Sequence, residues 1–394
     1  MSNLEELIER LCPDGVEYKT LGEICDIFTG GDLPKNCIKG SVSDKEHPYP
    51  VWGNGKEVYG FADKFKIAED AVVISSIGAN TGSVYFHKAF FTPIIRLKVI
   101  LPKKDNILIR YIYHYLSNIK IKSKSSSVPN MNASEIKAIK IPVPPLEVQR
   151  EIVRILDNFT FLTTELAAEL AARQKQYEYY KEYLFENHIF DVEWKRLDEL
   201  FPFIRNGFVG TIKSFFTNET DGIRYLEGTN IHDGVISDNE VLYVTKEFHK
   251  KHIKNQLKAD DILMVQSGHI GECAVVGKKY EGSNCHALII MSNGGKCLSK
   301  YYVYYFHTIK GFKSLTPAIT GGTIKHVLAG KIGKIKVPVP SLEQQQRIVD
   351  ILDRFDTLCN DISSGLPAEI EMRQKQYEYY RDKLLTFKEL KKEA

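Results

Sequence analysis

The sequence lacks any long hydrophobic run. A membrane-spanning helix needs about 18 or more consecutive apolar residues, and no stretch of the 394 residues approaches that length. The amino terminus, MSNLEELIER, is acidic and amphipathic, whereas a secretory signal peptide joins a basic start to an apolar segment. We therefore expect a cytoplasmic protein that has no membrane partner.

Cysteine is scarce, and none of the seven cysteines forms a Cys-x-x-Cys pair. The even spacing of Cys273, Cys285 and Cys297, with His286 beside one of them, leaves a zinc site open as an alternative. Buried thiols in a reducing cytoplasm explain the same residues more simply. We therefore expect no metal site in this chain.

Catalytic signatures are also missing. The sequence contains no Gly-x-x-x-x-Gly-Lys-Ser/Thr loop, no Gly-x-Gly-x-x-Gly turn, no His-Glu-x-x-His pair and no Gly-x-Ser-x-Gly elbow. Pro13-Asp14 followed by Glu17 and Lys19 imitates a nuclease signature, but the two intervening residues are too few for the two strands that such a metal site needs. A self-sufficient nuclease is therefore disfavoured, and we expect no catalytic residue and no cofactor in this chain.

The net charge is only +3, but its distribution is uneven. Residues 96–140 contain ten lysines and arginines against Asp105 and Glu135, and residues 306–340 contain six lysines and no carboxylate. Such runs are often only solvated faces. These two occupy equivalent positions in the two halves of the chain, and matching basic stretches favour nucleic-acid binding.

The two halves of the chain repeat each other. The segment RQKQYEYY occurs at 173–180 and again at 373–380, and IPVPPLE at 141–147 matches VPVPSLE at 337–343. A period of about half the chain indicates a duplicated domain with its helix, not a solenoid. Two similar halves suit a pseudo-twofold arrangement, which is the symmetry that fits two half-sites on a DNA duplex.

Each half shows the same order of landmarks. A β-branched run with a glycine loop occurs at 69–82 and 259–271, and a tyrosine-rich helical patch at 109–116 and 300–307. A proline-containing strand then closes each half. Between these landmarks the two sequences diverge. The pattern predicts a mixed α/β (α+β) fold with two similar globular domains that share a frame and differ in their loops.

A long helix follows the closing strand in each half. Spacings of four and three form a heptad seam at Ile152, Leu156, Phe159, Thr163, Leu166, Leu170, Arg173, Tyr177, Tyr180 and Leu184, and at Ile348, Leu352, Phe355, Cys359, Ile362, Ile370, Arg373, Tyr377, Tyr380 and Leu384. Four extra residues in the second helix are best placed at 363–366, where Gly365 and Pro367 predict a break. At ~1.5 Å per residue, 146–185 would span about 60 Å, so we expect the helices to pair as an antiparallel coiled coil.

The repeated octapeptide also suggests a docking surface. Tyr179 and Tyr379 lie off the seam, and exposed aromatic residues suit a protein interface. The alternative is that the helices only pack or form homodimers. The predicted partner-docking residues are Arg173, Gln174, Tyr177, Tyr179, Tyr180, Arg373, Gln374, Tyr377, Tyr379 and Tyr380.

With two variable domains, each followed by a helix carrying RQKQYEYY, the chain resembles the specificity subunit of type I restriction-modification enzymes. The most specific elements are PVPPLEVQ at 142–149 and its copy at 338–345. In addition, TELAAEL at 164–170 resembles the short repeat in the central helix of one branch of that family. The resemblance implies this division of the chain: target recognition domains at 1–145 and 189–340, and spacer helices at 146–188 and 341–394.

The resemblance also implies a function. Each domain would read half of a bipartite, asymmetric sequence in double-stranded DNA, and the helices would set the gap between the halves. The helices would also carry two methyltransferase subunits, which bring S-adenosylmethionine and flip the target adenine, while motor-nuclease subunits bring ATP and magnesium. The chain itself would be a non-catalytic reader and scaffold.

Base readout needs side-chain donors and acceptors on groove-facing loops. The predicted DNA-binding residues are the polar residues of divergent loops at equivalent places in the two halves: Asn80, Thr81, Lys122, Lys124, Ser125, Ser126 and Asn130, and Ser267, His269, Thr320, Thr323, Lys325 and His326. Each could equally be a turn former or a solvated lysine. The alternative function is a helix-mediated assembly or adaptor protein that does not read DNA.

Overall fold

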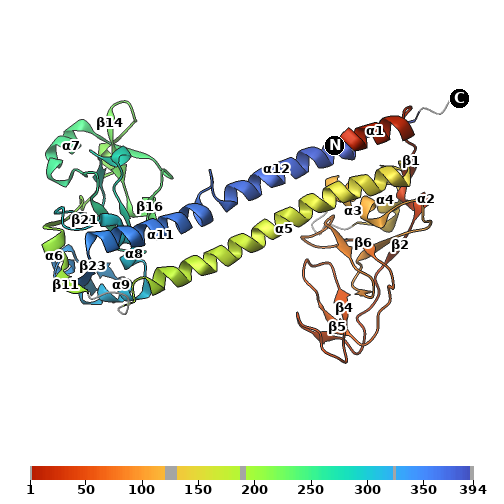
Figure 1. The fold of residues 1–394 in the computed structure, drawn as a ribbon, viewed down its shortest axis with the longest axis horizontal. Coiled ribbons are helices and arrows are strands. Elements are labelled where there is room, and N and C mark those ends of the chain that lie inside the picture. Colours follow the sequence, from red (N-terminus) through yellow and green to blue (C-terminus); the bar gives the residue numbers. More distant parts are fainter. Residues whose placement is uncertain (1, 120–130, 187–191, 323–324, 391–394) are drawn as a thin grey trace. The chain divides into compact units, whose positions relative to one another are not determined.

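The structure is a computed structural model, drawn in Figure 1. It describes all of the chain except five short stretches: 1, 120–130, 187–191, 323–324 and 391–394. The chain divides into two compact units. The first comprises residues 1–167 and 369–394, and the second comprises residues 168–368. Each unit therefore combines one globular domain with helical segments from both repeats.

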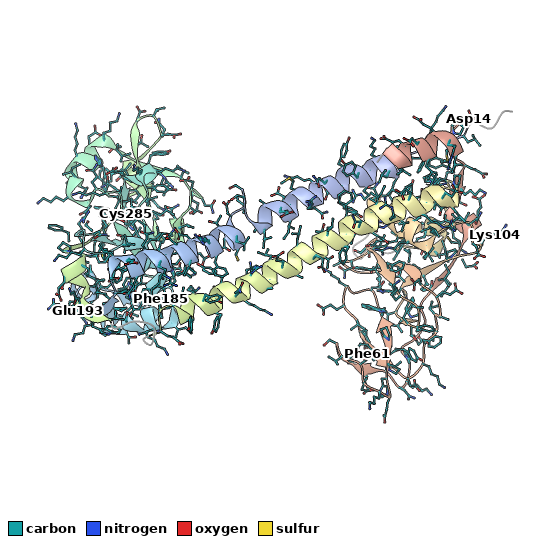
Figure 2. All side chains as sticks on the ribbon, in the orientation of Figure 1. Asp14, Phe61, Lys104, Phe185, Glu193 and Cys285 are labelled. Atoms are coloured by element: carbon teal, nitrogen blue, oxygen red, sulfur yellow. The ribbon has the colours of Figure 1, made fainter. Side chains whose placement is uncertain are left out.

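The globular part of the first unit contains two four-stranded sheets. The inner sheet is antiparallel with the order β2–β9–β6–β7, and its strands are Cys25–Thr29 (β2), Ala71–Ile74 (β6), Val84–His87 (β7) and Lys98–Pro102 (β9). The outer sheet has the order β3–β5–β4–β8, with a parallel β4–β8 pair, and its strands are Ile38–Lys39 (β3), Tyr49–Trp52 (β4), Gly60–Ala62 (β5) and Thr92–Pro93 (β8). Within this unit the outer sheet lies away from α5 (Leu146–Tyr183), and Phe61 marks its far end (Figure 2).

Helices and a two-stranded sheet complete the first unit. They are α1 (Ser2–Leu11), β1 (Tyr18–Thr20), α2 (Leu21–Ile24), α3 (Ile109–Asn118), α4 (Ala133–Lys137) and β10 (Lys140–Pro142), with β1 pairing antiparallel to β10. The fully buried residues Val72 of β6, Tyr111 of α3 and Ile152 of α5 belong to one core. The tyrosine-rich helix thus lies between the inner sheet and the start of the long helix, because its apolar positions face both.

The second unit repeats both strand orders. Its inner sheet, β12–β21–β18–β19, contains Phe203–Asn206 (β12), Ile262–Val265 (β18), Cys273–Val275 (β19) and Leu288–Ser292 (β21). Its outer sheet, β13–β17–β14–β20, contains Phe216–Thr217 (β13), Gly222–Leu226 (β14), Leu242–Thr245 (β17) and Asn284–Cys285 (β20), and β14–β20 is again the parallel pair. The expectation of two similar mixed α/β domains is confirmed.

Short elements connect these sheets and close the second domain. They are β11 (Glu193–Arg196), α6 (Leu197–Leu200), β15 (Ile231–His232), β16 (Val235–Ile236), α7 (Lys246–Lys251), α8 (Ser299–Phe306), α9 (Ile309–Ser314), β22 (Ile319–Thr320), β23 (His326–Val327), α10 (Ala329–Ile332), β24 (Lys336–Val339) and five single-turn 3-10 helices at Lys213–Phe215, Gly228–Asn230, Ile253–Asn255, Lys278–Tyr280 and Thr316–Ala318. The sequence landmarks fall where they were predicted: the tyrosine patch is α8, and the closing strand is β24, which pairs with β11.

A buried carboxamide joins the long helix to the domain in each unit. Gln149 of α5 is fully buried, accepts a hydrogen bond from Leu108 N (2.9 Å) and donates to Pro144 O (2.7 Å). Gln345 of α11 (Leu342–Asn360) is equally buried, accepts from Leu298 N (2.8 Å) and donates to Pro340 O (2.9 Å). These bonds fix the start of α3 or α8 against the proline-containing strand.

The heptad seam is confirmed along α5, whose residues from Leu156 to Tyr180 are half-buried or buried at the predicted positions and mostly exposed between them. In the first unit Phe159 stacks on Tyr380 of α12 (Leu366–Leu384), with ring centroids 5.5 Å apart, and the two helices run in opposite directions (Figure 1). In the second unit Tyr180 stacks on Phe355 in the same way, at 5.6 Å.

The predicted break in the second helix is also confirmed, since α11 ends at Asn360 and α12 begins at Leu366. A Cβ at Gly365 would lie 2.4 Å from Thr357 O, so only glycine fits this turn. The seam assignment of Ile362 is wrong, because its side chain is 79% exposed. The Asp361 carboxylate accepts hydrogen bonds from Ser363 N (2.7 Å) and from nearby hydroxyls, and these turn the chain before the seam can continue.

Candidate nucleic-acid interface

In the first domain the glycine loop after β6 carries Asn80 and Thr81. Gly78 and Gly82 both have a left-handed backbone, with φ of +83° and +90°, which glycine adopts without strain. Asn80 is exposed, and its Nδ2 donates to Asn54 O at 3.3 Å. The Thr81 hydroxyl donates to Gly78 O at 2.7 Å, so this residue stabilises the turn. Asn80 is the better placed of the two for contact with a ligand.

Five further predicted contacts of the first domain lie outside the described residues: Lys122, Lys124, Ser125, Ser126 and Asn130. The described chain resumes at Met131, whose N–H donates to Ser76 O at 3.0 Å. Ser76 follows β6 and lies fully buried. Met131 therefore lies beside the glycine loop that carries Asn80.

The second domain brings together the two corresponding segments. Ser267, in the glycine loop after β18, forms an antiparallel bridge with His326, and His326 pairs with Thr320 across the β22–β23 ladder. Ser267, Lys325 and His326 are exposed, whereas Thr320 is half-buried. Thr323 lies outside the described residues.

His269 is exposed two residues further along this glycine loop. Its ring centroid lies 6.2 Å from that of His232 at the end of β15. Three separate segments, the β15 end, the glycine loop and the β22–β23 hairpin, therefore gather exposed polar side chains at one site. The polar surface of this domain is built by tertiary contacts, which explains why no contiguous motif marks it.

The basic stretches only partly form a surface. Lys98 is buried in β9 and donates to Thr29 Oγ1 (2.9 Å), and burial lowers its pKa. Lys103 donates to Gly22 O (2.6 Å), and Arg110 Nε donates to Asp157 Oδ1 (2.8 Å). In the second domain Lys310 lies 5.0 Å from the ring centroid of Trp194. Several cations of the two basic stretches therefore have structural roles within the domains.

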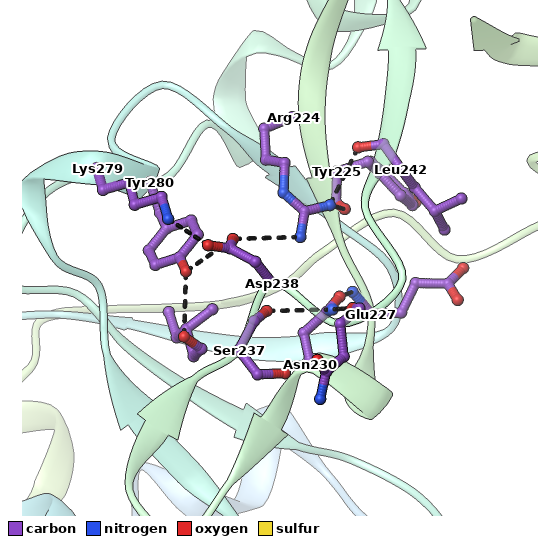
Figure 3. Close-up of polar contacts among 11 residues, drawn as sticks. Arg224, Tyr225, Glu227, Asn230, Ser237, Asp238, Leu242, Lys279 and Tyr280 are labelled. Atoms are coloured by element: carbon purple, nitrogen blue, oxygen red, sulfur yellow. Dashed lines mark hydrogen bonds and ion pairs between the residues drawn. The ribbon is translucent and has the colours of Figure 1, made fainter. Parts of the chain in front are cut away.

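A polar cluster fixes the loop between β16 and β17 in the second domain (Figure 3). The Asp238 carboxylate pairs with Lys279, accepts from the Tyr280 hydroxyl (3.0 Å) and lies 3.9 Å from Arg224. The hydrogen bond from Lys279 is the main cause that lowers the pKa of Asp238. Arg224 also donates to Leu242 O (3.2 Å). The two cations of this cluster, Arg224 and Lys279, therefore stabilise the loop.

The predicted docking residues fall into three groups. Tyr177, Tyr180, Tyr377 and Tyr380 are half-buried and form the helix seam against Phe355 or Phe159. Arg173 and Arg373 bond along their own helices to Gln176 (3.0 Å) and Gln376 (3.3 Å). The exposed group is Gln174, Gln374, Tyr179 and Tyr379, and the two tyrosines are 62% and 63% exposed.

Comparison with known proteins identifies the family. Residues 13–173 and 190–372 match the family described as Type I restriction modification DNA specificity domain, and together they make up most of the chain. The chain belongs to the type I restriction-modification specificity subunits. Members of this family bind DNA and are generally non-catalytic, and this specificity subunit carries two copies of the domain.

Two relatives extend the match to nearly the full length. The chain is 32% identical to the EcoR124I/EcoR124II specificity subunit of Escherichia coli, over 98% of this chain and 97% of the relative. It is 30% identical to a putative type I specificity subunit of Haemophilus influenzae, over 98% of this chain and 100% of the relative.

Solved structures share the fold at low sequence identity. The specificity subunit from M. genitalium matches with a TM-score of 0.58 and 15% identity, covering 94% of this chain and 96% of that one. The HsdS subunit from Thermoanaerobacter tengcongensis matches with a TM-score of 0.52 and 16% identity, covering 95% and 97%. The two-domain, long-helix architecture of this specificity subunit is therefore that of its family.

The structure places two residues at the glycine loop of the first domain that sequence reasoning did not select. Asn54 anchors Asn80, and it also bonds the backbone before β9. Arg96 lies exposed in that backbone turn. Asn54 stands between Gly53 and Gly55, a composition typical of a turn, but nothing in the sequence linked this turn to residue 80 or 96.

The cysteines that raised the zinc alternative lie in separate surroundings. Cys273 and Cys297 are buried in the core with Tyr302, and Cys285 is buried in another apolar cluster. Burial raises the pKa of Cys285 and Cys297 to about 12. Among the described residues no group of three His, Cys, Asp or Glu could hold a metal ion, and none of the described helices is long and apolar enough to cross a membrane.

Proposed function

We propose that this specificity subunit reads a bipartite, asymmetric DNA sequence, with one half read by each recognition domain. The supporting observation is that the same domain fold occurs twice. Both domains have the same two strand orders, the same parallel strand pair and the same buried glutamine, while the loops after β6 and β18 differ. The same fold with different polar loops is what two domains that read different half-sites require.

The helices supply the second part of the proposed role, which is to set the spacing and to carry partners. The 38 residues of α5 correspond to a helix of about 57 Å at ~1.5 Å per residue. Half-sites read from one face of B-DNA lie about 34 Å apart, so a helix of this length is adequate for a spacer. The four added residues of the second helix contribute the turn that ends α11 rather than a longer seam.

The exposed faces of the repeated octapeptides are the proposed docking surfaces for two methyltransferase subunits. Tyr179 and Tyr379 occupy the same place in the two copies, and each projects away from the seam that its neighbours form. Such rigid exposed aromatic residues serve well as interface anchors. The methyltransferases would supply S-adenosylmethionine and flip the adenine, and motor-nuclease subunits would supply ATP and magnesium.

The experiment that tests this function is to co-express the chain with its neighbouring methyltransferase and to map methylated adenines across the host genome by single-molecule sequencing. We expect an interrupted, asymmetric motif that disappears when the chain is omitted. Exchanging residues 16–140 for the same region of a relative should change one half of the motif only. A change in both halves would contradict independent readers.

The alternative is an assembly or adaptor protein whose domains bind other proteins. The exposed tyrosines are the observation that favours this alternative. The two functions differ in their response to salt. A DNA reader that makes several phosphate contacts loses affinity steeply as salt rises, because bound counterions are released on binding. An adaptor should show no salt-dependent DNA affinity when the chain is measured without the methyltransferase, which contacts DNA itself when it flips the adenine.

A further inference from the structure

We propose that Arg96 is a base-reading side chain of the first recognition domain, directed at a guanine, and that Asn54 and Ser76 are its positioning residues. This inference rests on the proposed function, since it names the base chemistry read by one of the two domains. It arises from a strained turn, Ile94–Leu97, that joins the outer sheet to β9.

The turn holds two consecutive non-glycine residues in the left-handed region. Ile95 has φ +48° and Arg96 has φ +61°, and both are exposed, Ile95 by 52%. Such backbone is strained for a residue with a side chain and persists only when surrounding contacts enforce it. Side chains of this kind are concentrated at binding sites, where the strain fixes a geometry in advance.

Side-chain hydrogen bonds enforce the turn from two neighbouring loops, one after β4 and one after β6. Asn54 Nδ2 donates to Ile95 O, and Ser76 Oγ donates to Arg96 O at 2.5 Å. Asn54 is itself held, because its Oδ1 accepts from Ser76 N (2.8 Å) and its backbone oxygen accepts from Ser75 Oγ (2.9 Å). Both serines are fully buried. The peptide groups on either side of Arg96 therefore have fixed directions.

The same anchor serves the predicted reader Asn80. Asn80 Nδ2 donates to Asn54 O, which places its loop directly beside the turn that carries Arg96. Met131, where the described chain resumes after the basic stretch, bonds to Ser76 O. Asn54 and Ser76 thus join three segments that lie far apart in the sequence, and Arg96 is an exposed cation at this junction.

The second domain contains the same turn without the arginine. Ala287 N donates to Phe208 O (2.9 Å), as Ile95 N does to Gly31 O (3.0 Å), and Ala287 is also left-handed, with φ +45°. After this turn the two domains match again, and the second domain reaches the match one residue sooner. Leu288 O accepts from Gly207 N (2.8 Å), as Leu97 O accepts from Gly30 N (2.7 Å). The first domain has therefore gained one residue, Arg96, inside an otherwise repeated turn.

The added residue is not needed for the charge balance of the fold. No carboxylate of the described chain lies within ion-pair distance of Arg96, whereas Arg110 of the same basic stretch pairs with Asp157 at 2.8 Å. A guanidinium can donate two parallel hydrogen bonds to O6 and N7 of guanine in the major groove, and this is the commonest specific contact of arginine. A backbone fixed in advance reduces the ordering cost of that contact.

The test uses the complex of the full chain with its methyltransferase and compares Arg96→Ala and Arg96→Lys with wild type. Lys104→Ala is the charge-matched control, because Lys104 is exposed in the turn at the opposite end of β9, about 25 Å from Arg96 along the strand direction. Thermal melting of each complex checks folding. Methylated sites are then mapped by single-molecule sequencing.

Arg96→Ala is expected to relax one guanine position in one half of the motif and to leave the other half unchanged. Arg96→Lys keeps an ammonium donor that can reach O6 and N7, so it is expected to relax the same position less. Replacing that guanine by 7-deazaguanine, which lacks N7, should weaken binding of the wild-type complex roughly 5- to 150-fold. The same replacement should leave binding of the Arg96→Ala complex nearly unchanged. Lys104→Ala should keep the wild-type motif.

Two results would overturn the inference. A motif that is unchanged in Arg96→Ala would remove the assignment and leave at most a phosphate contact, which carries no sequence information. Relaxation of both halves at once would show a general loss of domain structure. If the wild-type complex methylates no interrupted motif, the proposed function fails and this inference with it, and that outcome is distinct from a wild-type motif that the variants preserve.

Discussion

The side chain of Gln149 accepts a hydrogen bond from the backbone N–H of Leu108 at 2.9 Å, and it donates to Asn106 O (3.1 Å) and Pro144 O (2.7 Å). One fully buried carboxamide thus holds the start of α3, the loop before it and the strand that leads into α5. Gln345 makes the matching bonds to Leu298 and Pro340 in the second unit. The buried glutamine therefore connects the domain to the helix, and it occurs twice because the fold is repeated.

Gln149→Ala should lower the free energy of unfolding of the first unit by about 2–4 kcal/mol, because the buried Pro144 O and the backbone groups of Leu108 and Asn106 lose their partner. Gln345→Ala should cost somewhat less, since two such groups are affected. Gln346→Ala is the control: Gln346 is exposed and bonds only to Asp350 along its helix, so its loss should stay within about 0.5 kcal/mol. Urea unfolding measured by circular dichroism gives the values. Equal losses of unfolding free energy in Gln345→Ala and Gln346→Ala would contradict this connecting role of the buried glutamine.

The second stability prediction concerns Phe159. Its ring centroid lies 6.5 Å from that of Tyr377 and 5.5 Å from that of Tyr380 on the opposite helix. Phe159→Ala should destabilise the first unit by about 1–3 kcal/mol through lost apolar burial and ring stacking. Phe161→Ala on the same helix is the matched control, since that ring is 60% exposed. Hydrogen exchange along α12 would report the loosening directly. Protection that is unchanged in Phe159→Ala would show that the seam does not hold α12.

The heptad seam illustrates what the sequence can predict. Residues such as Leu156, Phe159 and Tyr180 recur at spacings of four and three, and the helix buries them because its geometry places that series on one face. Ile362 fitted the same spacing and is exposed, since the side chain of Asp361 stops the helix first. Periodicity predicts which face is buried, but a local capping interaction decides where the helix ends.

The binding loops show the opposite limit. The outer-sheet strands are as short as Ile38–Lys39, which is too short for an alternating pattern to be recognised. The contact of Asn54 with Ser76 joins residues twenty-two positions apart, and the β-bridge between Ser267 and His326 joins residues fifty-nine positions apart. Such pairs depend on how two sheets meet. Divergent polar loops could be selected as candidates from the sequence, but their grouping could not.

Tyr179→Ala and Tyr379→Ala should weaken methyltransferase binding roughly tenfold or more each, because exposed aromatic anchors dominate interface energies. Their stability should stay close to wild type, since both rings project away from the seam. Met372→Ala, an exposed apolar residue elsewhere on α12, is the control. Native mass spectrometry should show two bound methyltransferases with wild type, one with either single variant at limiting concentration, and none with the double variant. Two bound subunits in every case would contradict these docking surfaces.

His87 gives a prediction for pH. Its ring stacks on Trp52 with centroids 4.2 Å apart, and burial lowers its pKa from an ordinary 6.5 to about 4. The folded state therefore keeps the ring neutral at a pH where the unfolded chain binds a proton. Since the unfolded state then holds more protons, the free energy of unfolding must fall as the pH drops from about 6.5 to about 4. The loss from this residue is on the order of 2–3 kcal/mol.

His87→Phe tests this by removing the titration while keeping a ring against Trp52. The first unit of wild type should lose stability between pH 6.5 and pH 4 by about 2–3 kcal/mol more than the variant does, and the two should run parallel above pH 7. Subtracting the variant's profile removes the contribution of all other titrating groups, which the two proteins share. Urea unfolding across that range, with the fluorescence of Trp52 reporting the first unit, provides the measurement; the second tryptophan, Trp194, lies in the second unit. Parallel profiles down to pH 4 would mean that His87 is protonated without cost in the folded protein.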